Sequence, residues 1–279
     1  MNRFNTRILT VALSLIVSAA ATAKTMIDGI CYDLNAKTLE ATVTFQGESR
    51  SLTANPKYTA SSITIPSEVK YNNKTYKVTS IGCFAFYECK EVKSIKLPNT
   101  VTSIEQQAFE YCVNLTSINL PPSIKKIEMG VFSGCQSLTS IIIPEGVTTI
   151  SQEAFMYCGS LTSIVLPSTI IFISPESFQN CPNLKSITTK SPTPINLYNY
   201  TFDVFGELHV PAGSKEAYSN APIWKKFTII EDTETETTGI AQLSPITQQP
   251  TSVFNLSGQS LTAPQKGLNI INGKKVIVK

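Results

Sequence analysis

The chain has 279 residues, with 23 basic and 20 acidic side chains, and its net charge is +3 at pH 7. No block of like charge occurs, which argues against a nucleic-acid-binding protein and against attraction to an anionic membrane. The single histidine, His209, and the scattered acidic residues match no known catalytic or metal-binding motif. We therefore expect no enzyme, no metal and no cofactor.

The first 23 residues have the pattern of a signal peptide. Arg3 and Arg7 precede an apolar run at residues 8–17, and small residues follow up to Ala23. The run is shorter than the roughly 18 apolar residues of a transmembrane helix, and no later segment reaches that length. We expect an exported protein without a transmembrane segment, at the cell surface or secreted, with the periplasm as the alternative.

Residues 24–77 are predicted to form a β cap followed by a first partial repeat. Two strands are expected at 27–34 and 38–45, around a polar turn. Residues 63–66 resemble a strand of the repeat described next, but Pro66 precedes Pro98 by 32 residues, nine more than the repeat length. An insertion around residues 71–76, with an Asn-Asn turn, accounts for the excess.

Residues 78–189 contain five copies of a 23-residue repeat. The spacing holds for a phenylalanine column, a cysteine column and several aliphatic columns. The first two columns are Phe86, Phe109, Phe132, Phe155 and Phe178, and Cys89, Cys112, Cys135, Cys158 and Cys181. A period of about 20 to 29 residues that contains L-x-x-L-x-L, as at residues 115–120, is typical of leucine-rich repeats.

This pattern predicts a mainly β fold with short helical turns, a right-handed solenoid of stacked coils. One coil cannot bury its own apolar residues, so neighbouring coils must cover them. Each coil is expected to have a strand such as 115–120, ended by Pro121 because proline has no N–H for the ladder. Phe132 and Cys135 are expected to point inward from a turn.

The seven cysteines of an exported chain raise the question of disulfides. Equivalent cysteines in stacked coils lie within the separation that a disulfide tolerates, but their side chains point in parallel. We expect buried free thiols that pack as small apolar residues, with disulfide or metal use as the alternative. Cys31 and Cys83 lie outside the column.

Residues 190–230 are predicted to form a C-terminal cap. It should contain one more strand near His209, an ordinary exposed strand residue, and a helix at 214–224 with Ser214 as its N-cap. Trp224 and Phe227 are expected to pack inside the cap, with carbohydrate stacking as the alternative. An acidic linker follows at 231–250.

The last segment, 251–279, is predicted to be a small β tail. Short strands are expected at 251–256, 267–271 and 275–278. The last two are joined at Asn272 and Gly273, a strong hairpin signal.

The repeat unit at 101–121 resembles the repeat of the BspA-like bacterial leucine-rich-repeat surface proteins, and 213–218 with 221–225 resembles the closing segment common among them. This resemblance implies an exported, non-catalytic protein, in a family with members that bind host or bacterial proteins and assist adhesion. Residues 267–279 resemble, in shortened form, the C-terminal sorting domains of type IX secretion. The tail is then a working sorting signal, a relic or simply a small β unit.

Solenoids bind partners through the solvent-facing positions of the strands, where the repeats differ. One such column, Ser94 and its equivalents, is serine in all five coils, which favours a role in packing rather than in recognition. An apolar pair at 171–172 also faces outward, although we expect the C-terminal cap to cover Phe172. The candidate partner-binding residues are Lys93, Lys96, Asn119, Ile142, Val165 and Phe172.

Two functions remain open. The first is binding of an extracellular or surface protein in adhesion or interaction, through the strand face and without a cofactor. The second is a structural or carbohydrate-binding role in the envelope, with a glycan as the partner. Exposed aromatic side chains near a groove would favour the second, and the predicted strand face has none.

Overall fold

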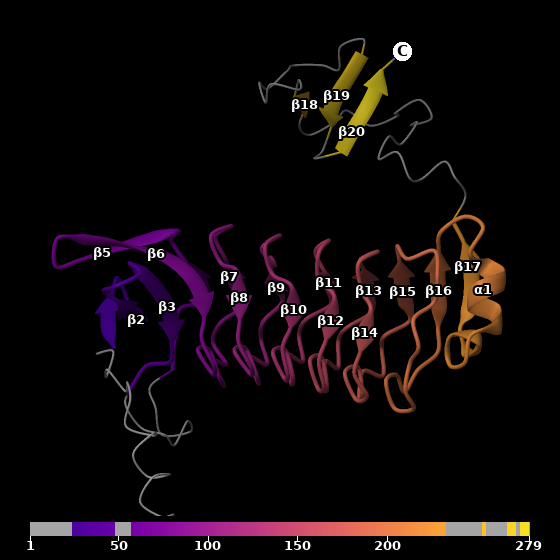
Figure 1. Cartoon of the computed structure of the whole chain (residues 1–279), viewed down its shortest axis with the longest axis horizontal. Helices are drawn as coiled ribbons and strands as arrows, with labels where there is room; N and C mark the ends of the chain where they lie inside the picture. Colours follow the sequence, from indigo (N-terminus) through magenta and orange to yellow (C-terminus); the bar gives the residue numbers. More distant parts are fainter. Residues whose placement is uncertain (1–23, 48–56, 233–252, 255–266, 272–273, 279) are drawn as a thin grey trace, which may run out of the picture.

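The computed structural model describes residues 24–47 and 57–232, and the strand segments 253–254, 267–271 and 274–278. The predicted signal peptide and most of the predicted linker lie outside the described residues. Residues 24–47 and 57–232 form a row of stacked coils with a β cap at one end and a small helix at the other (Figure 1). The predicted fold class, a mainly β solenoid of leucine-rich repeats, is confirmed.

The N-terminal cap is a sheet in which hairpins precede the first regular coil. Its strands are β1 (Thr25–Ile27), β2 (Ile30–Asn35), β3 (Glu40–Thr44), β5 (Glu68–Tyr71) and β6 (Lys74–Ile81). The strand predicted over 27–34 is wrong, because Asp28 and Gly29 have positive φ and divide it into β1 and β2. The predicted turn is correct: Asn72 and Asn73 both have positive φ and join β5 to β6.

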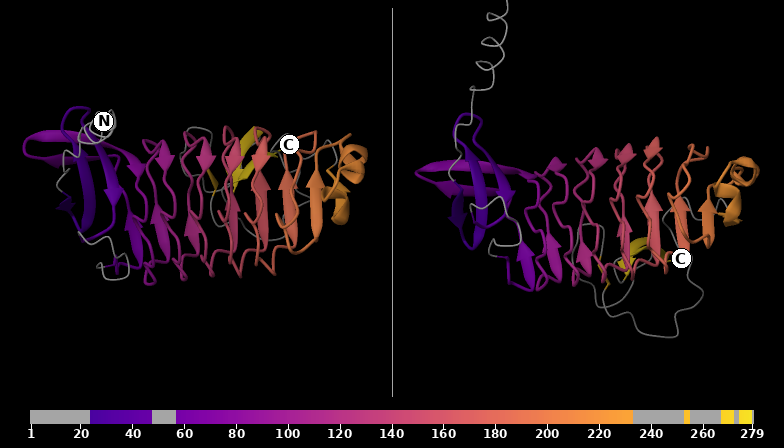
Figure 2. Two further views of the ribbon diagram at one scale, coloured as in Figure 1. Left: turned by 60° about the horizontal axis from the view of Figure 1, so that its bottom comes forward. Right: turned by 90° about the horizontal axis from the view of Figure 1, so that it is seen from below.

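Each coil contributes strands to two parallel ladders on different sides of the solenoid (Figure 2). The first ladder comprises β4 (Ser62–Thr64), β7 (Ser94–Lys96), β9 (Ser117–Ile118), β11 (Ser140–Ile142), β13 (Ser163–Leu166), β15 (Ser186–Thr189), β16 (Glu207–Val210) and β17 (Thr228–Glu231). The second comprises β8 (Ser103–Ile104), β10 (Lys126–Ile127), β12 (Thr149–Ile150) and β14 (Phe172–Ile173). Hydrogen-bonded strand pairing is interrupted between β9 and β11 in the first ladder, and between β8, which pairs with β6, and β10 in the second. The predicted strand at 115–120 is therefore too long, and the second ladder was not predicted.

The core is a stack of aromatic rings that runs along the solenoid. Successive phenylalanines of the column, from Phe86 to Phe178, lie nearly parallel, with ring centroids 5.2 to 5.5 Å apart. Tyr58 closes the stack at the N-terminal end, 4.9 Å from Phe86. Phe202 extends it at the other end, where Phe227 meets it edge-on at 5.5 Å. The inward column predicted from the repeat is confirmed.

The turn that carries the phenylalanine and cysteine columns has a backbone that the sequence did not indicate. In every coil two positions, four residues apart, have positive φ, as at Gln107 and Tyr111. In the third coil both are glycines, Gly130 and Gly134. In the other coils, non-glycine residues adopt positive φ at these two positions. They are held there because each turn donates backbone hydrogen bonds to the next, as from Tyr111 N to Ser133 O at 2.8 Å.

The C-terminal cap adds two rungs to the first ladder, β16 and β17, so Glu231 belongs to a strand and not to the predicted linker. The helix predicted at 214–224 is shorter: α1 spans Lys215–Asn220, and a 3₁₀ turn, Trp224–Lys226, follows beyond Pro222. Ser214 is the N-cap residue, but its side chain makes no capping hydrogen bond.

Trp224 is buried in the cap, and its indole N–H donates to Ile195 O at 2.7 Å. Phe227 is buried as well, so both residues pack as predicted. The tail strands are β18 (Val253–Phe254), β19 (Gly267–Ile271) and β20 (Lys274–Val278), which pair antiparallel.

Candidate functional site

The candidate site is the outward side of the first ladder, which we call the strand face. From Ile142 onward its central column is continuous, because parallel register places each residue on its equivalent in the next coil. Ile142 pairs with Val165, and Val165 with Thr188. The column continues through His209 to Ile230 in the cap. The column therefore extends two rungs beyond the five predicted coils.

Ile142 is the most exposed member of this column, with 69% of its surface accessible to solvent. Val165, beside it, is partly exposed, while the inward residues Ile141 and Ile164 are buried. Lys93 and Lys96 are also exposed, toward the N-terminal end of the same face. The ladder thus places the two apolar candidates side by side in solvent, as the alternation of a strand requires.

Asn119 has a structural task that sequence reasoning missed. In other coils the residue after the column position donates a backbone hydrogen bond to the next coil, as Ile143 N does to Val165 O. At Leu97 the Asn119 side chain replaces that bond: Leu97 N donates to Oδ1 at 2.9 Å, and Nδ2 donates to Leu97 O at 3.0 Å. The Asn119 amide is therefore occupied within the solenoid.

Polar side chains beside the central column also make contacts between coils. Thr116 Oγ1 donates to Lys93 O, and Thr162 Oγ1 donates to Thr139 O, each at 3.0 Å. In the serine column, Ser94 Oγ donates to Ser62 Oγ at 2.9 Å. This serine contact agrees with a packing role at the first rung.

Phe172 does not lie with the other candidates, because β14 belongs to the second ladder. The side chain remains 37% exposed, and Tyr198 meets its ring edge-on at 5.9 Å. The expected cover by the C-terminal cap is therefore only partial.

His209 differs from the ordinary exposed residue that was predicted. Its side chain is partly buried and lies between two carboxylates: Nε2 is 3.6 Å from Glu207 Oε2, and Nδ1 is 3.4 Å from Asp232 Oδ1. Because Asp232 belongs to the next coil, no spacing in the chain indicated this pairing.

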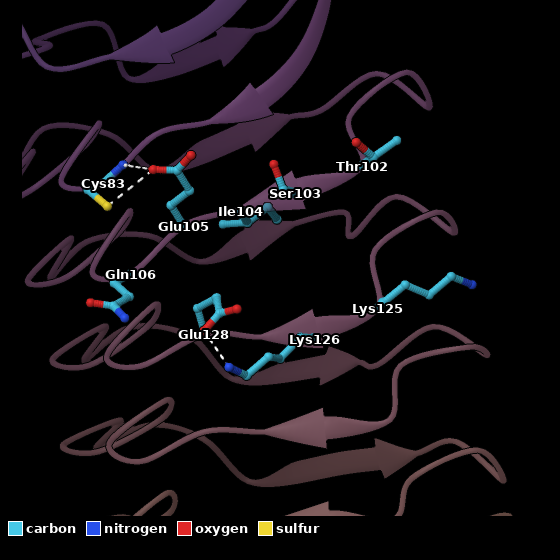
Figure 3. Close-up of a pocket in the computed structure, with 9 residues that line it drawn as sticks. All are labelled: Cys83, Thr102, Ser103, Ile104, Glu105, Gln106, Lys125, Lys126 and Glu128. Carbon is cyan, nitrogen blue, oxygen red and sulfur yellow. Dashed lines mark hydrogen bonds and ion pairs between the residues drawn. The ribbon is translucent and has the colours of Figure 1, made fainter. Parts of the chain in front are cut away.

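A hollow of about 690 Å³ lies on the second ladder (Figure 3). Cys83 is at its rim, where its backbone N–H and Sγ approach Glu105 Oε2 at 3.1 and 3.2 Å. Partial burial and the neighbouring carboxylate raise the pKa of this thiol to about 11. Lys126 and Glu128, which also line the hollow, form an ion pair in which Nζ lies 2.8 Å from Oε2. Since the thiol stays protonated at neutral pH, this hollow has no activated nucleophile.

All seven cysteines are free thiols, and the five of the column are buried. The predicted buried thiols are therefore present. Within the described part of the chain, no cluster of three or more histidine, cysteine or acidic side chains is arranged to hold a metal ion. No helix in that part is long and apolar enough to span a membrane.

Comparison with known proteins supports this description. Residues 79–206 match the family model of the BspA type leucine rich repeat region, in six copies. The fold is similar to that of the leucine rich repeat protein of T. pallidum, at a TM-score of 0.52 and 23% identity over 72% of this chain and 91% of that one. It is also similar to the pneumococcal vaccine antigen PcpA, at a TM-score of 0.54 and 19% identity.

The match to PcpA covers 78% of this chain and 49% of the antigen. None of the curated proteins compared with the chain is significantly similar to it. No catalytic family emerges from these matches. The chain is thus a leucine-rich-repeat solenoid whose residues 79–206 are similar to the BspA type of repeat.

Proposed function

We propose that this protein is an exported, non-catalytic module that binds another protein at the cell surface through its strand face. The observation that carries the proposal is the pair Ile142 and Val165, adjacent in the ladder and turned to solvent. Their apolar side chains gain free energy only when a partner removes them from water, at about 25 cal/mol per Å² buried. Binding by the alternating positions of a solenoid's strands needs no cofactor.

The polar surroundings of this pair fit a protein partner. The exposed residues Thr139, Ser140 and Thr162 precede the pair in their coils, and Thr162 Oγ1 donates a hydrogen bond to Thr139 O. A small apolar centre within a polar rim is the usual anatomy of a protein interface. Lys96 adds a positive charge near one end of the column, which favours an acidic partner surface there.

The location is tested first by protease shaving of intact cells, with mass spectrometry of the released peptides. We expect peptides from residues 78–189 to be released from cells that carry the whole chain. A second strain, whose chain stops after Asp232 and so keeps the whole of β17, tests whether the tail directs display, because it should release none. If neither strain releases them and both retain the protein in the periplasm, surface binding is wrong and an envelope role takes its place.

The face is tested by a photoreactive phenylalanine analogue placed at position 142 of the otherwise intact protein and activated on cells. We expect one protein adduct at position 142 and none at position 126, which lies on the second ladder. Introducing Val165→Asp should abolish the adduct while leaving the melting temperature nearly unchanged. Equal adducts at both positions, or an adduct that survives Val165→Asp, would contradict binding through the strand face.

A further inference from the structure

The coil that leads into the C-terminal cap is irregular and holds two tyrosines in solvent. Ser186 pairs with Glu207, a step of 21 residues where the regular coils take 23. Between β15 and β16, Tyr198 is 50% exposed and Tyr200 is 69% exposed. Two exposed aromatic side chains so close together in the chain can form an apolar patch, and such patches mark binding sites.

Both tyrosines line a pocket of about 220 Å³ between this coil and the cap. Asn199, Phe205 and Lys226 contribute to the same pocket. Lys226 Nζ lies 4.9 Å from the centre of the Phe205 ring, which holds the ammonium group at the pocket wall. The pocket therefore combines aromatic surface with one amide and one positive charge, and the described residues that line it include no carboxylate.

Backbone strain marks the same place. Ile223, which also lines the pocket, has φ 70° and ψ −53°, and Trp224 N donates to Pro222 O at 2.9 Å. This is the rare γ-turn with positive φ, and a β-branched residue is a genuine outlier there. The buried Trp224, anchored by its bond to Ile195 O, keeps Ile223 in this conformation. Such backbone strain persists only where surrounding contacts fix the conformation, and it is common at ligand-binding sites.

We infer that this pocket binds a single sugar residue of a glycan, and an acidic sugar in preference to a neutral one. The apolar C–H face of a sugar ring packs on aromatic rings, here Tyr198 and Tyr200, and the Asn199 amide offers both a donor and an acceptor to hydroxyl groups. Lys226 excludes a cationic ligand and attracts a carboxylate. The volume is below the roughly 300–1,000 Å³ of pockets for larger ligands, so it suits one ring.

The site is independent of the strand face. Its aromatic wall touches the second ladder through the contact of Tyr198 with Phe172, whereas Ile142 and Val165 lie on the first ladder. The proposals of a glycan-binding pocket and of a protein-binding face can therefore be tested in separate experiments.

The test is saturation-transfer NMR on the purified protein with two probes, N-acetylneuraminic acid and galactose, each at about millimolar concentration. We expect transfer to N-acetylneuraminic acid and much weaker transfer to galactose. Tyr200→Ala and Tyr198→Ala should each weaken binding of the acid by about tenfold. Tyr198→Ala is the necessary second variant because Tyr198, unlike Tyr200, has no positive φ.

Lys226→Gln should reduce transfer to N-acetylneuraminic acid to the level of galactose. Tyr71→Ala is the matched control, because Tyr71 is an exposed tyrosine on the N-terminal hairpin, and it should change nothing. Absence of transfer to either sugar, or transfer that survives both tyrosine variants, would overturn the site. Equal transfer to both sugars would overturn the preference for an acidic one.

Discussion

The Sγ atom of Cys112 lies 3.0 Å from the carbonyl oxygen of Phe86 in the preceding coil and donates a hydrogen bond to it. The same contact recurs from Cys135, Cys158 and Cys181, at 3.0 to 3.3 Å. Burial raises the pKa of Cys112 and Cys135 well above the usual value, so these thiols remain protonated donors. The cysteine column therefore ties each coil to the one before it, in addition to filling space.

Replacing one thiol of the column should weaken the solenoid. Cys112→Ala removes both the hydrogen bond to Phe86 O and the buried sulfur atom, so we expect the free energy of unfolding to fall by about 1–3 kcal/mol. Urea denaturation followed by circular dichroism measures the change. The matched control is Cys83→Ala, because Cys83 is exposed, and a loss as large as that of Cys112→Ala would contradict a specific role for the column.

Stability should also fall in alkaline solution. The ordinary thiol pKa is 9.0, and burial raises that of Cys89 to about 11. The thiol ionises at a lower pH in the unfolded chain than in the folded protein. The fold is therefore most stable with respect to this group below pH 9, and it loses stability as the pH rises from 9 to about 11. The slope for one thiol is at most about 1.4 kcal/mol per pH unit.

Urea midpoints measured from pH 7 to pH 11 check this prediction, with Cys89→Ala as the variant whose slope should be smaller. Tyr32 adds to the fall above pH 10, because burial raises its pKa to about 12. A midpoint that stays constant up to pH 11 would show that these groups are not buried in solution.

Gly134 and Gly213 form a matched pair of glycines with positive φ, at 72° and 78°. A Cβ atom added to Gly134 would clash with Cδ1 of Tyr111, whereas one added to Gly213 meets no atom within 4 Å. Gly213→Ala should therefore cost only backbone strain, about 1–2 kcal/mol, and Gly134→Ala should cost more. In the double variant Gly134→Ala/Tyr111→Ala, removal of the Tyr111 ring should restore part of the stability that Gly134→Ala loses. Thermal unfolding of the wild type, the two glycine variants and the double variant measures these differences.

Tyr58 should be essential to the N-terminal end of the solenoid. Its ring covers Phe86, while its hydroxyl donates to Thr44 O at 2.6 Å and accepts from Cys31 N at 3.0 Å. Tyr58→Phe keeps the ring but leaves two buried backbone groups without a partner, so we expect a loss of about 1–3 kcal/mol. Tyr58→Ala should lose about 3–5 kcal/mol. Equal losses in urea denaturation would show that the ring contributes nothing.

Asn119 was a candidate for partner binding, and its contacts predict a stability phenotype instead. Asn119→Asp keeps an acceptor for Leu97 N but replaces the donor to Leu97 O with a negatively charged oxygen. We expect a fall in unfolding free energy of about 1–2 kcal/mol. Ser117→Asp introduces the same charge at an exposed position on the same coil and serves as the control. Similar effects of both variants would mean that only charge matters here.

The repeat allowed much of this fold to be predicted, because each column is a physical constraint repeated in five coils. The 23-residue step of Phe109 and Cys112 requires stacking, and stacking fixes which side chains are inside. The strand positions of Ile142 and Val165 followed from the same alternation. Their pairing in the ladder followed from the repeat as well, since equal spacing places equivalent residues side by side.

Other features depend on contacts between segments with no repeat relationship, which is why the sequence did not predict them. Tyr58 stands next to Phe86 only because the N-terminal cap folds over the first coil. His209 meets Asp232 only because the cap adds a further rung. The second ladder has strands of two residues, too short to produce an alternating pattern.

The sequence alone determined the solenoid, its buried columns and the order of its parts, because periodic burial leaves a periodic record in the residues. The tertiary structure decided which exposed positions are free and which are engaged: Asn119 is bound to Leu97, whereas Ile142 is open to solvent. It also placed Tyr198 and Tyr200 beside Lys226. Such contacts follow from how irregular segments pack against one another, and no spacing in the chain encodes that packing.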